Sequence, residues 1–245
     1  MTGDSPNGMK ILASFNISRA FKTVYGLLYL LIGIIFPLIL SGILLFSLKS
    51  IVNSGAGSSL VLEIIPSFVP IAASLGGIGV AYLFSTDRSN GVYEYLIATG
   101  KIKISDIFLS FSLVTVAVVS LILAIDISGI FILVHFIAPS LLVKMFEFFG
   151  VFSIPVSYIS ALLSILAMLS WTAMSKVYPG VNAPGGIGSI IGIIPAVVFL
   201  VVVIRIIKPS AIILVAGLFS LSLFVILILL LMVVIRRMSN ETMLA

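Results

Sequence analysis

The chain has 245 residues, of which 61% are hydrophobic and 9% are charged, and its formal net charge is +5. Soluble domains carry about 25% charged residues, so a soluble globular domain is excluded and lipid must solvate much of the surface. The cations are scattered at the ends of apolar runs, which is typical of topological anchors and argues against nucleic-acid binding. The sequence has no cysteine and one histidine, so thiolate metal sites are excluded and we expect no metal centre.

Apolar runs long enough to cross a bilayer recur along the whole chain. They are continuous rather than alternating, which favours helices over a β-barrel. We therefore expect an all-α, multi-pass membrane protein with a single transmembrane domain over residues 1–245. The six predicted transmembrane helices cover about residues 25–48, 65–85, 104–136, 151–174, 187–204 and 211–235. Loops are expected at 49–64 and 137–150. Small residues in the second span predict close packing on another helix; they are Gly76, Gly77 and Gly79.

The pattern of residues 10–24 predicts an amphipathic helix that precedes the first span in the sequence and lies in the membrane interface. Its apolar side chains recur at helical spacing, at Ala13, Ile17, Ala20, Phe21 and Val24. Cations such as Arg19 and Lys22 occupy the other side, where we expect them to face anionic lipid head groups. The alternative is a cytoplasmic extension of the first span.

An even number of spans places both termini on one side of the membrane. With the N-terminus inside, the inner segments hold nine Lys and Arg residues and the outer segments hold four. The positive-inside rule therefore predicts an N-in and C-in orientation. In that orientation residues 86–103, between the second and third spans, lie in the cytoplasm.

Residues 86–103 form the longest polar interval between two apolar runs. Asp87 and Arg88 end the second span, and Gly91 gives the backbone freedom to turn. Residues 93–98 are then long enough for a short helix.

This short helix has a charged side and an apolar side. Glu94 falls in its first turn, where a carboxylate complements the helix dipole. Tyr93, Leu96 and Ile97 share one side by their i, i+3 and i+4 spacing. Such a helix is suited to docking in a groove on a soluble partner, and a solvated loop is the alternative.

Residues 87–100 resemble the coupling segment of type-2 ATP-binding-cassette (ABC) transporter permeases. That family carries an acidic-Arg-Glu-x-Gly-Thr-Leu-Glu-x-Leu-Leu-Ala-Thr-Pro pattern between its second and third spans. The matching positions are Asp87, Arg88, Gly91, Glu94, Leu96, Ala98 and Thr99, with Ile97 as a close substitute. The departures are Ser89 for an acid, Val92 for a threonine, Tyr93 for a leucine and Gly100 for a proline.

The resemblance implies a permease subunit, of the type found in exporters, that moves its substrate by alternating access. Separate ATPase subunits would bind ATP and Mg²⁺, and a second permease copy, identical or related, would complete the transporter in the prokaryotic plasma membrane. The residues that couple to the ATPase would be Asp87, Arg88, Gly91, Tyr93, Glu94, Leu96 and Ile97. The chain lacks the Gly-x-x-x-x-Gly-Lys-Ser/Thr nucleotide cradle, so we do not expect it to be an enzyme itself.

Three alternatives remain open. Import-type permeases have a Glu-Ala-Ala-x-x-x-Gly loop, and Glu94 and Gly100 have that spacing, but both alanines are missing. A self-sufficient ion-coupled secondary transporter would need acids near the midplane and inverted repeats, and the sequence offers one acid and no clear repeat. A membrane enzyme would need a cluster of His, Asp or Glu, which is missing.

Asp126 is the acid inside the third span. An ionisable residue in a span is a functional candidate by default. Its position in the outer half of the span favours a structural role or a place on the substrate path over proton coupling.

Overall fold

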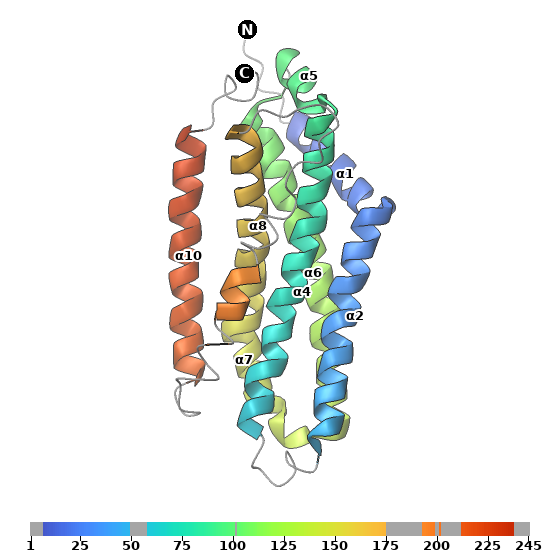
Figure 1. The fold of residues 1–245 in the computed structure, drawn as a ribbon, viewed down its shortest axis with the longest axis vertical. Helices are drawn as coiled ribbons and strands as arrows, with labels where there is room; N and C mark the ends of the chain where they lie inside the picture. Colours follow the sequence, from blue (N-terminus) through green and yellow to red (C-terminus); the bar gives the residue numbers. More distant parts are fainter. Residues whose placement is uncertain are drawn as a thin grey trace.

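The computed structural model describes residues 7–49, 58–100, 102–174, 193–198, 201 and 212–237. These residues form helices joined by short turns, and no strand occurs among them. Within the described residues, five helical segments are long and apolar enough to cross a membrane. Figure 1 shows the long helices side by side with roughly parallel axes. This helix bundle is consistent with a multi-pass membrane protein.

The helices in chain order are α1 (Asn7–Lys22), α2 (Val24–Ser47), α4 (Ser58–Ser89), α5 (Val92–Ala98), α6 (Ile104–Ile137), the 3₁₀ turn η1 (Pro139–Leu141), α7 (Leu142–Phe148), the π-helical segment η2 (Phe149–Ser153), α8 (Ile154–Met174) and α10 (Ile212–Arg237). α2, α6 and α10 begin and end close to the ranges predicted for the first, third and sixth spans. The fifth predicted span, residues 187–204, lies largely outside the described residues.

The loop predicted at 137–150 is wrong, because the chain there is helical from η1 through α7 and η2. Its buried residues recur at helical spacing, at Leu141, Met145, Phe148, Phe149 and Phe152, while Lys144 and Glu147 lie on the exposed side. Lys144 and Glu147 led to the prediction of a loop, but they lie on the exposed side of an amphipathic helix. The loop predicted at 49–64 is also too long, since α4 begins at Ser58.

α4 lies at the centre of the bundle, in contact with α2, α6 and α8, as Figure 1 shows. Its glycines let neighbouring helices approach, as the sequence predicts. A β-carbon added at Gly77 would lie 3.0 Å from the carbonyl oxygen of Ala161 in α8, and one added at Gly76 would meet Ile122 of α6. α2 and α10 lie at the sides and expose most of their apolar side chains, which suits contact with lipid.

The helix α4 contains two prolines, which interrupt its backbone hydrogen bonds. Pro70 has no N–H, so the carbonyl of Pro66, four residues earlier, loses its helical donor. Ser153 of η2 supplies the missing donor, because its hydroxyl donates to the Pro66 oxygen at 2.8 Å and is fully buried. In lipid a buried backbone carbonyl needs a hydrogen-bond donor, so this contact compensates for the proline inside α4.

Replacing Ser153 should therefore destabilise the protein more than replacing an equally buried serine with a local bond. Ser153→Ala leaves the Pro66 carbonyl without a donor, and we expect a loss of about 1–3 kcal/mol. Ser164→Ala is the control, because Ser164 donates to the carbonyl of Ser160 within its own helix, and we expect a smaller loss since that helical carbonyl keeps its backbone N–H donor. Equilibrium unfolding in mixed micelles measures both, and equal losses would contradict the assignment.

Candidate functional site

Asp87, in the last turn of α4, joins three helices at one end of the bundle. Its Oδ2 accepts a hydrogen bond from Nη1 of Arg19 in α1 at 2.6 Å and another from the hydroxyl of Tyr93 in α5 at 2.8 Å. Asp87 is 5% exposed, so both hydrogen bonds lie in a poorly solvated place where charge-assisted bonds are strong. The carboxylate thus fixes α1 and α5 relative to the end of α4.

Arg19 belongs to the side of α1 that the sequence assigns to lipid head groups. The structure instead turns it toward Asp87, and the hydrogen bond to that carboxylate raises the pKa of the guanidinium, which stays a cation. A second polar contact holds α1 against the bundle, since the buried amide of Asn16 donates to Ser110 of α6 at 3.0 Å. The predicted apolar residues Ala13 and Ala20 are buried, which agrees with an amphipathic helix.

Tyr93 places an aromatic ring and a hydroxyl in the same packed corner. The side chain is 1% exposed, its ring stacks on Phe84 of α4 at 5.1 Å between centroids, and it meets the ring of Phe111 of α6 edge-on at 6.1 Å. Burial raises the pKa of the phenol well above its ordinary value, so the hydroxyl remains a neutral donor to Asp87. The geometry satisfies both the apolar body and the polar tip of tyrosine.

The apolar side of α5 has the predicted members but faces the protein's own bundle. Tyr93 and Ile97 are buried and Leu96 packs against the same core cluster. The apolar side of α5 therefore packs on the other helices of this chain. The outer side of α5 presents Val92, 39% exposed, and Tyr95, 72% exposed.

Glycines bracket α5 at both ends. Gly91, before the helix, has φ +70°, and Gly100, after it, has φ +67°. Glycine adopts this left-handed region without the steric cost that other residues meet. A proline, with φ fixed at about −65°, could not take the conformation of Gly100, which is one of the four positions where the sequence departs from the coupling-segment pattern.

Arg88 and Glu94 form a second ionic contact between α4 and α5. Arg88 Nε lies 3.6 Å from Glu94 Oε1, and Arg88 is 7% exposed. Among the described residues, Arg88 Nε and Nη1 and Glu94 Oε2 have no hydrogen-bond partner. The pair is held by charge rather than by close hydrogen bonds, so it is the looser of the two ties on α5.

The structure thus gathers most of the predicted site residues at one end of the bundle: Asp87, Arg88, Gly91, Tyr93, Glu94, Leu96 and Ile97. Asp126 is not among them, because it lies in the far half of α6, fully buried. Arg19 is the partner that the sequence interpretation missed. One signal for this pair lies in the sequence: Arg19 is a cation in the predicted interfacial helix, and Asp87 is an acid at the end of the second predicted span.

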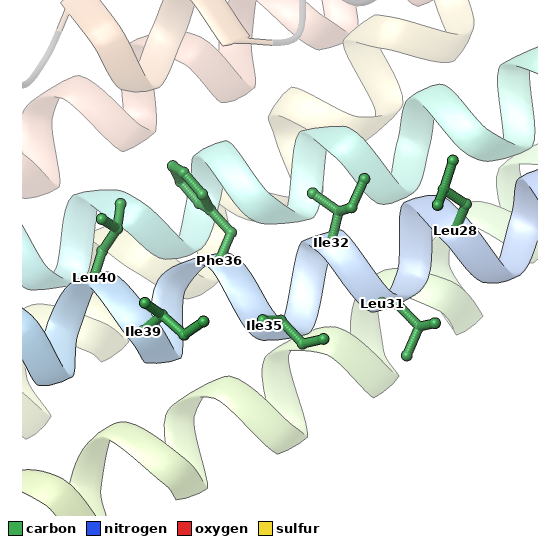
Figure 2. Close-up of a pocket in the computed structure, with 7 residues that line it drawn as sticks. All are labelled: Leu28, Leu31, Ile32, Ile35, Phe36, Ile39 and Leu40. Atoms are coloured by element: carbon green, nitrogen blue, oxygen red, sulfur yellow. The ribbon is translucent and has the colours of Figure 1, made fainter.

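One hollow on the surface follows α2. It has a volume of about 450 Å³, and its lining is apolar: Leu28, Leu31, Ile32, Ile35, Phe36, Ile39 and Leu40. Figure 2 shows that all seven side chains project from α2, to both sides of that helix. With no polar group in its lining, this hollow has no means of orienting a polar ligand.

The described residues contain no group of three His, Cys, Asp or Glu side chains that could hold a metal ion. In the cluster around Asp87, Arg19 pairs with Asp87 and Arg88 with Glu94. No protein-family model, curated protein or solved structure matches the chain.

The hydroxyl of Tyr93 should contribute measurably to stability. Tyr93→Phe keeps the ring contacts and removes one hydrogen bond to a carboxylate, so we expect a loss of about 1.5–3 kcal/mol in the free energy of unfolding. Tyr95→Phe, two residues away on the exposed side, should change it by about 0.5 kcal/mol or less. Unfolding in mixed micelles compares the two variants, and a Tyr93→Phe protein as stable as Tyr95→Phe would refute the role of the bond.

Proposed function

We propose that this chain is the membrane-spanning permease subunit of a type-2 ABC transporter, of the type found in exporters. In this proposal the chain crosses the membrane six times, with both termini in the cytoplasm. Separate ATPase subunits bind ATP and Mg²⁺, and a second permease copy completes the transporter in the cell membrane.

The observation that carries the proposal is that α5 packs on the bundle with one side and is exposed on the other. Its inner side is held by Tyr93, through Asp87 to α4 and through Phe111 to α6. Its outer side exposes Val92 and Tyr95. A short helix fixed on one side to two spans and open on the other can take up a displacement from a soluble partner and pass it to those spans.

The mechanism requires that the ATPase bind one arrangement of the spans more tightly than another, because a ligand shifts an equilibrium only by its differential affinity. In our proposal ATP closes the ATPase pair, α5 moves with the groove that holds its exposed side, and the Asp87 contacts oblige α1 and α4 to follow. Hydrolysis belongs to the partner, since the sequence has no nucleotide cradle.

A second candidate is a self-sufficient ion-coupled secondary transporter. The observation in its favour is Asp126, which is fully buried inside a span. Such a protein would need no ATPase, so isolation of the chain from its native cells separates the two candidates.

The test is purification of the tagged full-length chain in mild detergent from its native cells. We expect an ATPase with nucleotide-binding motifs to co-purify in equal amount. Tyr95→Ala should weaken that association, since truncating an aromatic anchor at an interface costs about 2 kcal/mol or more, which is about thirtyfold in affinity.

Phe146→Ala in α7 is the matched control. Phe146 is 71% exposed, as Tyr95 is 72% exposed, but α7 lies away from the end of the bundle that carries α5, as Figure 1 shows. It should leave the association unchanged. A folded chain that purifies without any ATPase overturns the proposal, and equal effects of the two substitutions refute the docking role of α5.

A further inference from the structure

Asp126 is a buried carboxylate that the described residues leave unsatisfied. The residue is 0% exposed, and neither Oδ1 nor Oδ2 has a hydrogen-bond partner among the described residues. The other buried acid described above, Asp87, accepts two hydrogen bonds. An ionised carboxylate inside a membrane protein is costly unless a positive charge compensates it. Neither ion pair found among the described residues includes Asp126.

The depth of Asp126 in the bundle follows from the contacts of the preceding helical turn. A β-carbon added at Gly33 of α2 would lie 3.0 Å from Cδ1 of Ile122 in α6 and 3.2 Å from the carbonyl oxygen of Ala72 in α4. The three helices therefore meet at the level of Ile122. Asp126 follows Ile122 by four residues, so its side chain shares the face that meets α2 and α4.

One turn beyond this meeting point, two of the three helices carry a proline. α2 and α6 run in the same direction, since Leu38 of α2 meets Gly129 of α6 beyond the Gly33 contact. At the depth of Asp126, α2 therefore reaches Pro37 and α4 reaches the turn that contains Pro70. Both prolines are buried.

Interrupted helices provide oxygen atoms that an intact helix does not. Pro37 has no N–H, so the carbonyl of Gly33 loses its usual helical donor. Ser41, one turn further along α2, is buried, and its hydroxyl has no partner among the described residues. Transporters bind small cations near the midplane with carboxylates and with carbonyls of interrupted helices.

No charged side chain described on the neighbouring helices is positioned to neutralise Asp126. The titratable residues on α6 and on the elements packed against it are Lys10, Arg19 and Lys22 (α1), Tyr25 and Tyr29 (α2), Glu63, Tyr82, Asp87 and Arg88 (α4), Asp106 and His135 (α6), Lys144 and Glu147 (α7) and Tyr158 (α8). The cations among them lie toward helix ends, in α1, in the last turn of α4 and in α7. Tyr158 pairs with Ser120, six residues before Asp126.

We propose that Asp126 is the centre of a binding site for a small monovalent cation, a proton or an alkali-metal ion, enclosed by α2, α4 and α6. The bound cation neutralises the carboxylate, and the oxygens beside Pro37 complete its surroundings. This inference does not rest on the proposed ATPase partner, and its test requires none.

The first test is carbodiimide labelling of the purified full-length chain in lipid nanodiscs. An apolar carbodiimide reacts with a protonated carboxyl in apolar surroundings, and mass spectrometry locates the adduct. With choline as the salt cation, we expect Asp126 to be labelled, and the labelled fraction to fall about tenfold per pH unit once the site releases its proton. Suppression by Na⁺ at fixed pH identifies an alkali-metal site, and no effect of Na⁺ identifies a proton site.

The second test compares melting temperatures of the wild type, Asp126→Asn and the control Glu147→Gln, whose carboxyl is exposed. The wild type and Glu147→Gln should share a dependence of Tm on pH or Na⁺, with shifts of about 3 °C or more, and Asp126→Asn should lose it. Absence of label at every pH, together with the same pH and Na⁺ dependence in wild type and Asp126→Asn, overturns the proposal. Failure to recover an ATPase would leave both readouts unchanged, so the two proposals fail separately.

Discussion

The carboxylate of Asp87 is the contact on which the end of the bundle depends. One of its oxygens accepts a hydrogen bond from the guanidinium of Arg19 and another from the phenol of Tyr93, so the same atom of α4 positions both α1 and α5. The phenol can reach that oxygen only while its ring lies against Phe84 and Phe111. A single position of the Tyr93 side chain therefore makes both the hydrogen bond to Asp87 and the ring contacts, so a change in one affects the other.

The sequence predicts α5 well because its signals are local. Gly91 marks the turn, Glu94 marks the first helical turn, and the spacing of Tyr93 and Ile97 shows which side chains share a face. The surface that covers this face could not be predicted, since an apolar stripe can pack on its own bundle or on a partner with the same periodicity. The rings that cover Tyr93 belong to Phe84 of α4 and Phe111 of α6, and no local pattern shows that these two helices meet at α5.

Some polar groups inside the bundle find their hydrogen-bond partner on a segment far away in the sequence. Ser153 donates a hydrogen bond to the carbonyl of Pro66, which Pro70 leaves without a helical donor, and Asn16 donates one to Ser110. The sequence shows each proline and each serine, but it cannot show which donor meets which acceptor. Within the part of the chain that the structure describes, the buried carboxyl of Asp126 has no hydrogen-bond partner on either oxygen, and leaving a charge unpaired costs far more than leaving a hydroxyl unpaired.

α6 connects the two regions that carry proposals. Phe111 near its beginning touches Tyr93 of α5, and Asp126 lies 15 residues further on. At the helical rise of about 1.5 Å per residue this is a separation of about 22 Å. A helix transmits displacement along its axis as a stiff element. If α5 moves against α4 as we propose, Phe111 connects that movement to α6, which lies on α2 at the depth of Asp126. A cation held there would favour one packing of these helices over another, so α6 could relate docking at one end to occupancy in the interior.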